Sequence, residues 1–357
     1  PPRSTRGRSW AASDVLKRQI LRTASQLRKT GDVVGMTLGD VVFDNMNIYP
    51  HYVESIKNHR MTFFQCIGNH DFEKAYADLH NSSVGAERYA EQMFGRYFGP
   101  VNYSFNIGNA HVVTIKSINY RGCCHYEEEI TEEDLRWLER DLSYVPKDRL
   151  VILNMHAPGW NAMEPIDNIL NAKRLEEILA PYDAHVFAGH THFFENVEVS
   201  PRLYQHNIGS ACGAWWTSNI CRDGSPNGYM VVTVDGKKLR WKYRSANSKS
   251  DVQMRVYTPG EFRTQKDFIV ANVWEWDPHC RVVWYEDGKY KGLMQRFIDN
   301  DEAFLRTKPR KHQLAKTGHL FRARPSSKKY RYIKVIFIMR FGETCTWKAG
   351  SYTKHRA

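Results

Sequence analysis

Four short apolar segments, each followed directly by residues that commonly bind metal ions, constrain the fold of this chain most strongly. The segments are Val33–Leu38, Met61–Ile67, Leu150–Leu153 and Ala184–Ala188. Each is too short for a helix and is rich in β-branched or aromatic residues, which is typical of a buried strand. The sequence therefore predicts four strands whose carboxyl ends carry polar motifs.

Helical patterns separate these strands, and alternating strands and helices predict an α/β layered core. The clearest helix start is the capping box Thr131-Glu132-Glu133-Asp134, which opens a helix to about Leu142. We also expect helices at Tyr52–Asn58, 85–97 and Asn171–Leu179, a helix that begins at Ser13 and Asp14 and runs to Leu27, and a hairpin of Tyr103–Ile107 with His111–Ile118.

The sequence after Ser200 is rich in aromatic residues and shows no helical periodicity, which predicts a β-rich structure. The expected strands are Leu203–Ile208, Tyr229–Val234, Lys238–Tyr243, Phe268–Trp274, Arg281–Glu286, Gly292–Phe297 and Tyr332–Met339. The expected domains are a basic N-terminal segment with the first helix at 1–30, a core at 31–205, closing strands of the core or the start of the next domain at 206–248, and a β-rich C-terminal domain at 249–357.

The polar motifs after the four strands are Gly39-Asp40 with Asp44, Gly68-Asn69-His70-Asp71, Asn154-Met155-His156 and Gly189-His190-Thr191-His192. Ligands of open α/β sheets bind beyond the carboxyl ends of the strands, so these motifs can converge on one crevice. A lone Gly-Asp is mostly a turn, and a lone Asn-His says little more. In this order and after these strands, they predict one shared site.

Carboxylate, amide and imidazole ligands together suit a hydrolytic site with two metal ions. Asp40 is the best candidate for a bridging ligand. Asn69, His156 and His190 would complete the shell of one ion, and His192 would bind the other. Nitrogen and oxygen ligands without thiolate suit divalent Mn, Fe, Zn, Co or Ni.

Other side chains are expected around the ligands. His70, next to Asn69, would face the substrate, and Asp71 or Asp44 would orient an imidazole. The tryptophans Trp160, Trp215 and Trp216 are candidates for the substrate side, although buried aromatic residues more often belong to a core. We interpret His111, His125 and His185 as structural and Asp277-Pro278-His279 as a turn.

These motifs resemble those of the calcineurin-like metallophosphoesterases over about residues 12–245. The resemblance implies a four-layer α/β-sandwich with two central sheets, two divalent transition-metal ions bridged by Asp40, and hydrolysis of a phosphomonoester or phosphodiester by a metal-activated hydroxide. It also implies that His70, with Asp71 beside it, is catalytic. The stretch Asn207 to Trp216 leads into a tail that resembles the C-terminal domain of a bacterial, Bacteroides-type branch, for which export to the periplasm is expected.

One departure from the family pattern concerns the start of the core. The family opens with a strand that ends in Asp-x-His or Asp-x-Gln, whose residues share a metal ion with His192, but no such motif precedes Asp40. We expect a truncated or altered N-terminus, because the other ligands are intact. The alternative is a catalytically impaired protein that binds one ion or a partner. No signal peptide is recognised at Pro1–Arg8.

The net charge and the cysteine pattern bear on two other classes of function, nucleic-acid binding and structural zinc binding. The net charge of +12 is concentrated at the ends, with +7 in residues 1–30 and +14 in residues 306–357. A nucleic-acid binder is one interpretation of the basic tail, but without a recognised nucleic-acid motif we favour a solvated β-domain surface. Seven cysteines without a CxxC pair argue against structural zinc, and Cys212 and Cys221 could form a disulfide. No apolar run is long enough to span a membrane as a helix.

Overall fold

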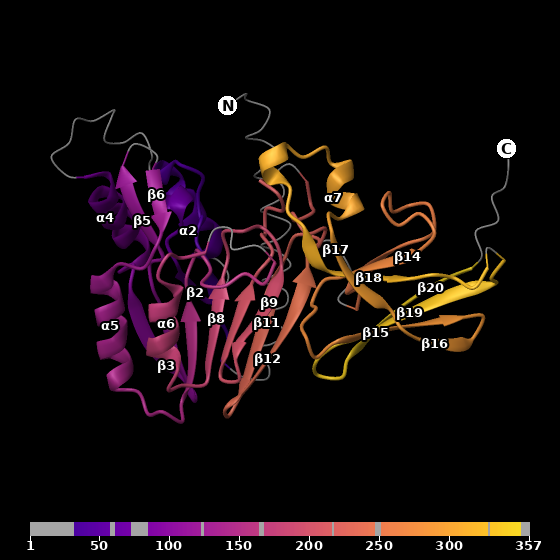
Figure 1. Cartoon of the computed structure of the whole chain (residues 1–357). Helices are drawn as coiled ribbons and strands as arrows, with labels where there is room; N and C mark the ends of the chain where they lie inside the picture. The colour runs from indigo at the N-terminus through magenta and orange to yellow at the C-terminus, as the bar shows by residue number, and fades with distance from the viewer. Residues whose placement is uncertain are drawn as a thin grey trace.

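The computed structural model describes residues 32–57, 61–72, 85–122, 125–163, 168–215, 218–246, 251–327 and 329–350. Strands and helices alternate in the first half of this part of the chain and strands predominate in the second half, as predicted. Figure 1 shows the helix-covered core at one end of an elongated molecule and the β-rich region at the other. The helix predicted from Ser13 to Leu27 lies outside the described residues.

A six-stranded sheet forms the centre of the core, with the order β3-β4-β7-β8-β10-β9. The four inner strands are parallel, and both edge strands are antiparallel to their neighbours. The inner strands are almost completely buried, which agrees with the apolar residues that predominate in β4, β7 and β8, while β10 also buries Gln205, His206 and Asn207. The strands are β3 (Tyr103–Ile107), β4 (Ala110–Thr114), β7 (Leu150–Asn154), β8 (Ala184–Ala188), β9 (Glu195–Ser200) and β10 (Leu203–Asn207).

Residues of the inner strands point alternately to the two faces of this sheet. On one face, Val151 and Leu153 of β7 pack with apolar residues of helices α5 (Glu132–Ser143) and α6 (Ala172–Leu179). The predicted capping residue Thr131 is confirmed, because its hydroxyl accepts a hydrogen bond from the Asp134 amide. Helices α2 (Tyr49–Lys57) and α4 (Ala86–Phe98) contribute to the same hydrophobic cluster.

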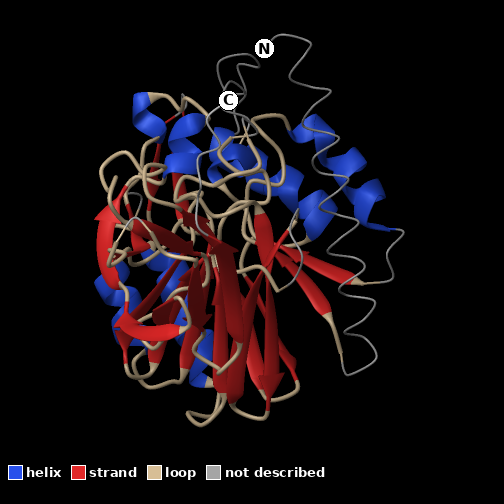
Figure 2. Ribbon diagram, turned by 90° about the vertical axis from the view of Figure 1, so that its right-hand side faces the viewer, coloured by secondary structure: helices blue, strands red, loops and turns tan. Residues whose placement is uncertain are grey.

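On the other face, Leu150 and Ile152 of β7 belong to a second hydrophobic cluster, which two small sheets cover. One sheet pairs β1 (Val34–Thr37) in parallel with β2 (Thr62–Gln65), and the other is the hairpin of β11 (Gly228–Asp235) and β12 (Lys238–Ser245). Figure 2, viewed from the side of the C-terminal region, shows strands through the middle of the molecule and most of the helices toward its periphery. The predicted α/β-sandwich with sheets at its centre is confirmed.

The β-rich region is a sandwich of two four-stranded sheets, ordered β13-β14-β18-β17 and β16-β15-β19-β20. A third cluster, which includes Val273, Trp284, Phe321 and Val335, fills the space between them. The strands are β13 (Met254–Tyr257), β14 (Ile269–Val273), β15 (Arg281–Glu286), β16 (Lys289–Leu293), β17 (Gln295–Asp299), β18 (Thr317–Ala323), β19 (Tyr332–Ile338) and β20 (Thr344–Gly350).

Two expectations for this region were wrong. The strand predicted at Gly292–Phe297 is the end of β16 and the start of β17, which belong to different sheets. The chain changes sheet at Met294, whose buried side chain lies in the core of the sandwich. The region also contains one short helix, α7 (Glu302–Arg306), because the Asp301 carboxylate caps the amides of Ala303 and Phe304.

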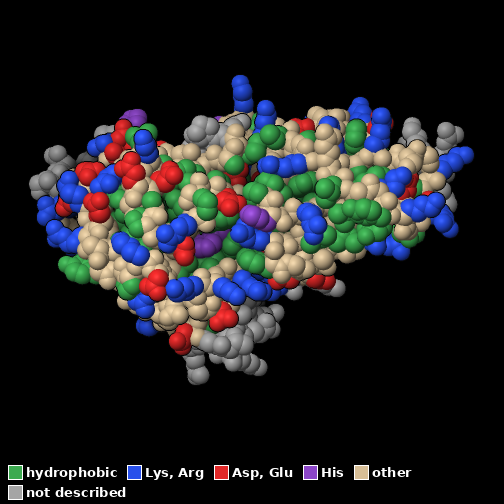
Figure 3. Space-filling model, turned by 60° about the horizontal axis from the view of Figure 1, so that its bottom comes forward, with side chains coloured by type: hydrophobic (Ala, Val, Ile, Leu, Met, Phe, Trp, Pro, Cys, Tyr) green, Lys and Arg blue, Asp and Glu red, His purple; other side chains and the backbone are tan. Residues whose placement is uncertain are grey.

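The structure also bears on a further hairpin, on the cysteines and on membrane-spanning helices. A hairpin of β5 (Ile118–Gly122) and β6 (His125–Glu128) was not predicted. Cys212 and Cys221 carry thiols and do not form a disulfide with each other. No helix in the described part of the chain has both the length and the hydropathy needed to cross a membrane. Figure 3 shows Lys and Arg side chains scattered over this face, with Asp and Glu among them mainly over the N-terminal half.

Candidate metal centre

The four predicted motifs meet at one end of the central sheets. Backbone hydrogen bonds continue the strand pairing into the loops, from the amide of Cys66 to the carbonyl of Thr37 and from the amide of Gly189 to the carbonyl of His156. Parallel neighbours end at the same edge of a sheet, so the residues after β1 and β2, and after β7 and β8, emerge side by side.

Three glycines allow these loops to approach closely. A Cβ atom at Gly68 would collide with the amide nitrogen and Oδ1 of Asp40. Gly39 has a φ of +92°, and a Cβ there would meet Nδ1 of His156. At Gly189 a Cβ would lie 3.1 Å from the carbonyl oxygen of Leu38. In three of the four motifs, a glycine therefore leaves room for a neighbouring loop.

Several predicted site residues have a strained backbone. Seven non-glycine residues in the described ranges have positive φ, and five of them are Asp40, Asp44, His190, His192 and Trp215. Side chains of L-residues disfavour this region at a cost of about 1–3 kcal/mol each, and such residues gather at functional sites. The strain marks the same loops that the sequence motifs mark.

His156 presents one particular nitrogen to the site. Its Nδ1 lies 2.6 Å from the carbonyl oxygen of Leu38, which can only accept, so Nδ1 carries the proton. Burial lowers the pKa of His156 to about 4, although the nearby Asp40 acts in the other direction. The neutral ring therefore directs the lone pair of Nε2 toward the loops of Asp40 and Asn69.

His190 is oriented in the same way by a residue that the sequence did not reveal. Its Nε2 lies 3.2 Å from Oε1 of Glu128, at the end of β6. Burial tends to raise the pKa of Glu128, but the hydrogen bond from His190 brings it below its ordinary value, so the carboxylate accepts. Nδ1, the other ring nitrogen of His190, lies 3.0 Å from Nε2 of His156.

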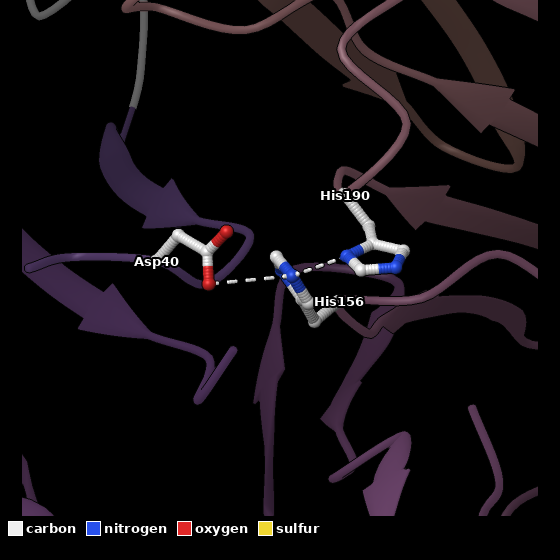
Figure 4. A group of neighbouring side chains, drawn as sticks. All are labelled: Asp40, His156 and His190. Atoms are coloured by element: carbon white, nitrogen blue, oxygen red, sulfur yellow. Dashed lines mark hydrogen bonds and ion pairs between the residues drawn. The ribbon is translucent and has the colours of Figure 1, made fainter. Parts of the chain in front are cut away.

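Nε2 of His156 and the side-chain oxygens of Asn69 and Asp40 thus converge at one point as acceptor atoms. Nε2 of His156 lies 2.9 Å from Oδ1 of Asn69 and 3.4 Å from Oδ1 of Asp40. The ligand atoms of Asp40, His156 and His190 all lie within 4.8 Å of one another, and Figure 4 shows these side chains pointing toward a common centre. Such lone pairs repel one another unless a cation lies between them, so these residues fit a bound metal ion.

His192 and Trp215 form a second part of the site. Nδ1 of His192 donates to the carbonyl oxygen of Gly213 at 2.9 Å, which leaves the lone pair on Nε2. Trp215 stacks on this imidazole with the ring centroids 4.7 Å apart. His192 is thereby held in the tautomer that a metal ligand needs. Trp216 lies outside the described residues.

The two predicted catalytic residues have different surroundings. Nδ1 of His70 lies 2.9 Å from Oδ1 of Asp44, and the ring stacks on Phe43. Asp71 instead accepts hydrogen bonds from the amides of Gly68, Val41 and Val42, and it is fully buried. Burial, with Asp40 nearby, raises the pKa of Asp71 to about 8. Asp71 therefore supports the loop of Asp40, and Asp44 is the carboxylate that orients His70.

A cavity of about 220 Å³ adjoins these residues. Trp160 packs against the core cluster and is not among the residues that line this cavity. Sequence reasoning missed three of the lining residues, Tyr126, Arg222 and His312, which no motif surrounds. The complete lining is Asp40, Asn69, His70, Tyr126, His190, His192, Trp215, Arg222 and His312.

The chain is 28% identical over 160 residues to the 3',5'-cyclic adenosine monophosphate phosphodiesterase CpdA of Escherichia coli, strains K12 and O157:H7. The match covers 43% of this chain and 52% of the relative. The chain thus spans about half the length of the curated relatives that it matches.

Solved structures of similar arrangement include a dimetal phosphatase from Danio rerio, at 13% identity and a TM-score of 0.42, covering 73% of this chain and 86% of that one. A 5'-nucleotidase from Candida albicans has 13% identity and a TM-score of 0.41, covering 68% of this chain and 48% of that one.

Two family models match nearly the whole chain. The model of the calcineurin-like phosphoesterases covers residues 10–194, which include every proposed metal ligand. The model of the C-terminal part of calcineurin-like phosphoesterases covers residues 205–345. The first match extends over more than half of the chain, and its motifs are those that meet at the site. The chain therefore belongs to the calcineurin-like phosphoesterase family.

Proposed function

We propose that this protein hydrolyses a phosphoester with two divalent transition-metal ions. The observation that carries the proposal is the convergence of Asp40, Asn69, His156 and His190 on one point, with acceptor atoms 2.9–3.4 Å apart. His192, held by Gly213, is the proposed ligand of the second ion. When bound, such ions lower the pKa of water and neutralise charge that develops on the phosphoryl oxygens.

Asp40 has a proposed role in holding both ions. Asp40 is the proposed bridging ligand, because its Oδ1 faces His156 while the amide of His70 donates to the same oxygen at 2.9 Å. Burial raises the pKa of Asp40, but the surrounding histidines bring it below its ordinary value, so this residue is a carboxylate. An ionised carboxylate at this point attracts cations.

His70 is the proposed proton donor to the leaving oxygen. The Asp44 carboxylate accepts from Nδ1, so Nε2 is the atom at which the ring can hold and release the second proton. His70 lines the cavity beside the proposed ligands. Arg222, which also lines the cavity, adds positive charge where a phosphoryl group would bind.

Metal content and turnover of the purified chain test this proposal together. The substrates would be 4-nitrophenyl phosphate, bis(4-nitrophenyl) phosphate and 3',5'-cyclic adenosine monophosphate, the last because the curated relatives are named as its phosphodiesterases. We expect two ions per chain and hydrolysis that stops when a chelator is added. A chain that neither binds metal nor hydrolyses any of the three would contradict the proposal.

Matched variants make the test specific. His156→Ala removes a proposed ligand and should reduce metal content, whereas His279→Ala removes an exposed imidazole that pairs with Glu198 and should not. One ion per chain without turnover would instead support the catalytically impaired alternative.

A further inference from the structure

The C-terminal region contributes to the lining of the cavity through His312, and the turn Arg310–Gln313 that carries this residue forms one wall. His312 lines the cavity together with Asp40, His70 and His192, which lie far before it in the sequence. The residue belongs to a short 3₁₀-helix, Lys311–Gln313, and its side chain is exposed. A residue outside the metallophosphoesterase core is therefore in position to contact whatever enters the site.

Arg222 fixes this wall to the proposed metal centre. Its guanidinium donates to the carbonyl of Thr191 at 3.1 Å, between the two histidines of the Gly-His-Thr-His motif. The same group donates to the carbonyls of Gln313 at 3.1 Å and Leu314 at 3.4 Å. Arg222 is 5% exposed, and a planar guanidinium with several donors restricts the geometry of all three carbonyls.

Hydrogen bonds within the turn Arg310–Gln313 also hold this wall in place. Oε1 of Gln313 accepts from the amide of Arg310 at 2.8 Å, and the side chain of Gln313 is buried. The amide of Gln313 donates back to the carbonyl of Arg310 at 2.9 Å. These reciprocal bonds close the turn that carries Lys311 and His312, so both side chains project from a fixed backbone.

The segment around this wall is strongly basic. Arg306–Lys316 contains five Lys and Arg residues and no acidic residue. Arg310, Lys311 and Lys316 are exposed on either side of His312. A cleft bordered by charges of one sign concentrates ligands of the opposite sign. The mouth of the cavity next to His312 thus favours anions.

The size of the cavity indicates where the rest of a substrate lies. At about 220 Å³ the cavity is smaller than the about 300–1,000 Å³ usual for a complete small-molecule site. It can take a phosphoryl group and a small part of the group that is esterified to it. The remainder must extend past the rim, where His312 and its basic neighbours lie.

We infer that Arg310–Gln313 is part of the substrate site and binds a second anionic group of the phosphoester, remote from the bond that breaks. Lys311 and His312 are then specificity-determining residues, and Arg222 is a positioning residue that holds them against the metal centre. The preferred substrate class is phosphoesters with an additional carboxylate or phosphate, rather than esters of neutral alcohols. This inference rests on the proposed function.

Binding of two phosphonates that cannot be hydrolysed tests it by calorimetry on the metal-loaded protein. Phenylphosphonate and 4-carboxyphenylphosphonate differ by one carboxylate. The wild type should bind the second about two- to fivefold more tightly, the range expected for partly exposed ion pairs. In Lys311→Ala/His312→Ala this preference, taken as the ratio of the two affinities of the same variant, should fall to about one. Lys311→Glu should invert the preference.

The control is Lys289→Ala/His279→Ala, which removes the same two kinds of side chain from exposed positions elsewhere in the C-terminal region. An equal preference in the wild type and in the Lys311 and His312 double variant would overturn the inference alone, since both phosphonates still bind. If neither phosphonate binds and no phosphoester is hydrolysed, the proposed function fails together with it.

Discussion

Oδ1 of Asp44 lies 2.9 Å from Nδ1 of His70, and both residues follow strands of the same two-stranded parallel sheet. The amide of Asp44 also donates to the carbonyl of His70 at 2.9 Å, so the two residues are joined by backbone and side chain. Asp44 has a φ of 54°, and this left-handed conformation belongs to the turn that returns its side chain to the imidazole.

His70→Ala should lower kcat about 10²–10⁴-fold while leaving the metal content near that of the wild type, because in the proposed function the imidazole donates a proton and is not a metal ligand. Asp44→Asn should cause a smaller loss, since the amide can still hydrogen-bond the ring but carries no charge to stabilise the imidazolium. Steady-state kinetics and elemental analysis of the same preparations measure both effects. Full activity of His70→Ala would show that the role of this residue is assigned incorrectly.

Glu128 should matter for metal affinity although it is not a proposed ligand. Its carboxylate holds Nε2 of His190 at 3.2 Å, and partners of this kind commonly change metal affinity or activity about 10–100-fold. Glu128→Ala should therefore weaken metal binding by this order, and Glu128→Gln, which keeps an acceptor oxygen, should weaken it less. A metal titration measures the affinity. If Glu128→Ala lowers only the melting temperature and leaves the affinity unchanged, Glu128 is merely structural.

Chelation should destabilise the folded protein. An ion that binds only the native state adds about 2.7 kcal/mol to stability at a concentration one hundred times its Kd. Removing metal should therefore lower the Tm of the wild type, and adding back Mn, Zn, Co, Ni or Fe should restore it. In Asp40→Ala, which lacks the proposed bridging carboxylate, neither treatment should change the Tm. Equal responses of the two proteins in thermal melts would argue against Asp40 as a ligand.

Gly68→Ala should damage the site by a purely steric route. The added Cβ would overlap the amide and Oδ1 of Asp40 and lie 2.8 Å from Cε1 of His156, so the Asp40 loop must move. We expect reduced metal content and activity, with a loss of stability of about 1–3 kcal/mol as for other overpacked sites. Gly95→Ala is the matched control: no heavy atom lies within 4 Å of its Cβ position in α4, so it should be neutral or stabilising.

The motifs and the strands before them could be predicted because both are local features. A strand such as Ala184–Ala188 is recognised by its short, mainly apolar sequence, and its parallel pairing with β7 brings His156 and His190 together. Glu128 could not be found in this way. It lies in an acidic run, Glu127–Glu129, which lacks the alternating apolar pattern by which the hairpin of β5 and β6 could be recognised. Its partner His190 is also 62 residues away in the sequence.

The position of His312 beside the cavity also could not be predicted from the sequence. In the chain, Lys311 and His312 are indistinguishable from the many exposed basic residues of the tail. Their position depends on Arg222, whose three carbonyl partners come from two distant segments and leave no pattern in the residue types. Contacts with backbone carbonyls are specified by the packing of whole regions, which local periodicity does not encode.

A buried carboxyl group that does not line the cavity predicts how stability depends on pH. Glu275 is 4% exposed and accepts the amide of Tyr243 at 2.8 Å, and burial raises its pKa from 4.5 to about 8. The native state therefore holds a proton that the unfolded chain releases near pH 4.5. The stability that this proton contributes is complete below that pH and is lost as the pH rises toward 8.

Glu275→Gln should remove this dependence, because the amide keeps an acceptor oxygen for Tyr243 without a charge to bury. The Tm difference between the variant and the wild type should be small or negative at pH 5. The corresponding difference in unfolding free energy should grow in favour of the variant up to pH 8, by on the order of 1 kcal/mol for each unit of pKa shift. Glu54→Gln, at an exposed position of α2, is the control and should give a flat difference. Thermal melts of the three proteins across this range decide the matter, since a flat difference for Glu275→Gln would mean that the buried carboxyl ionises without cost.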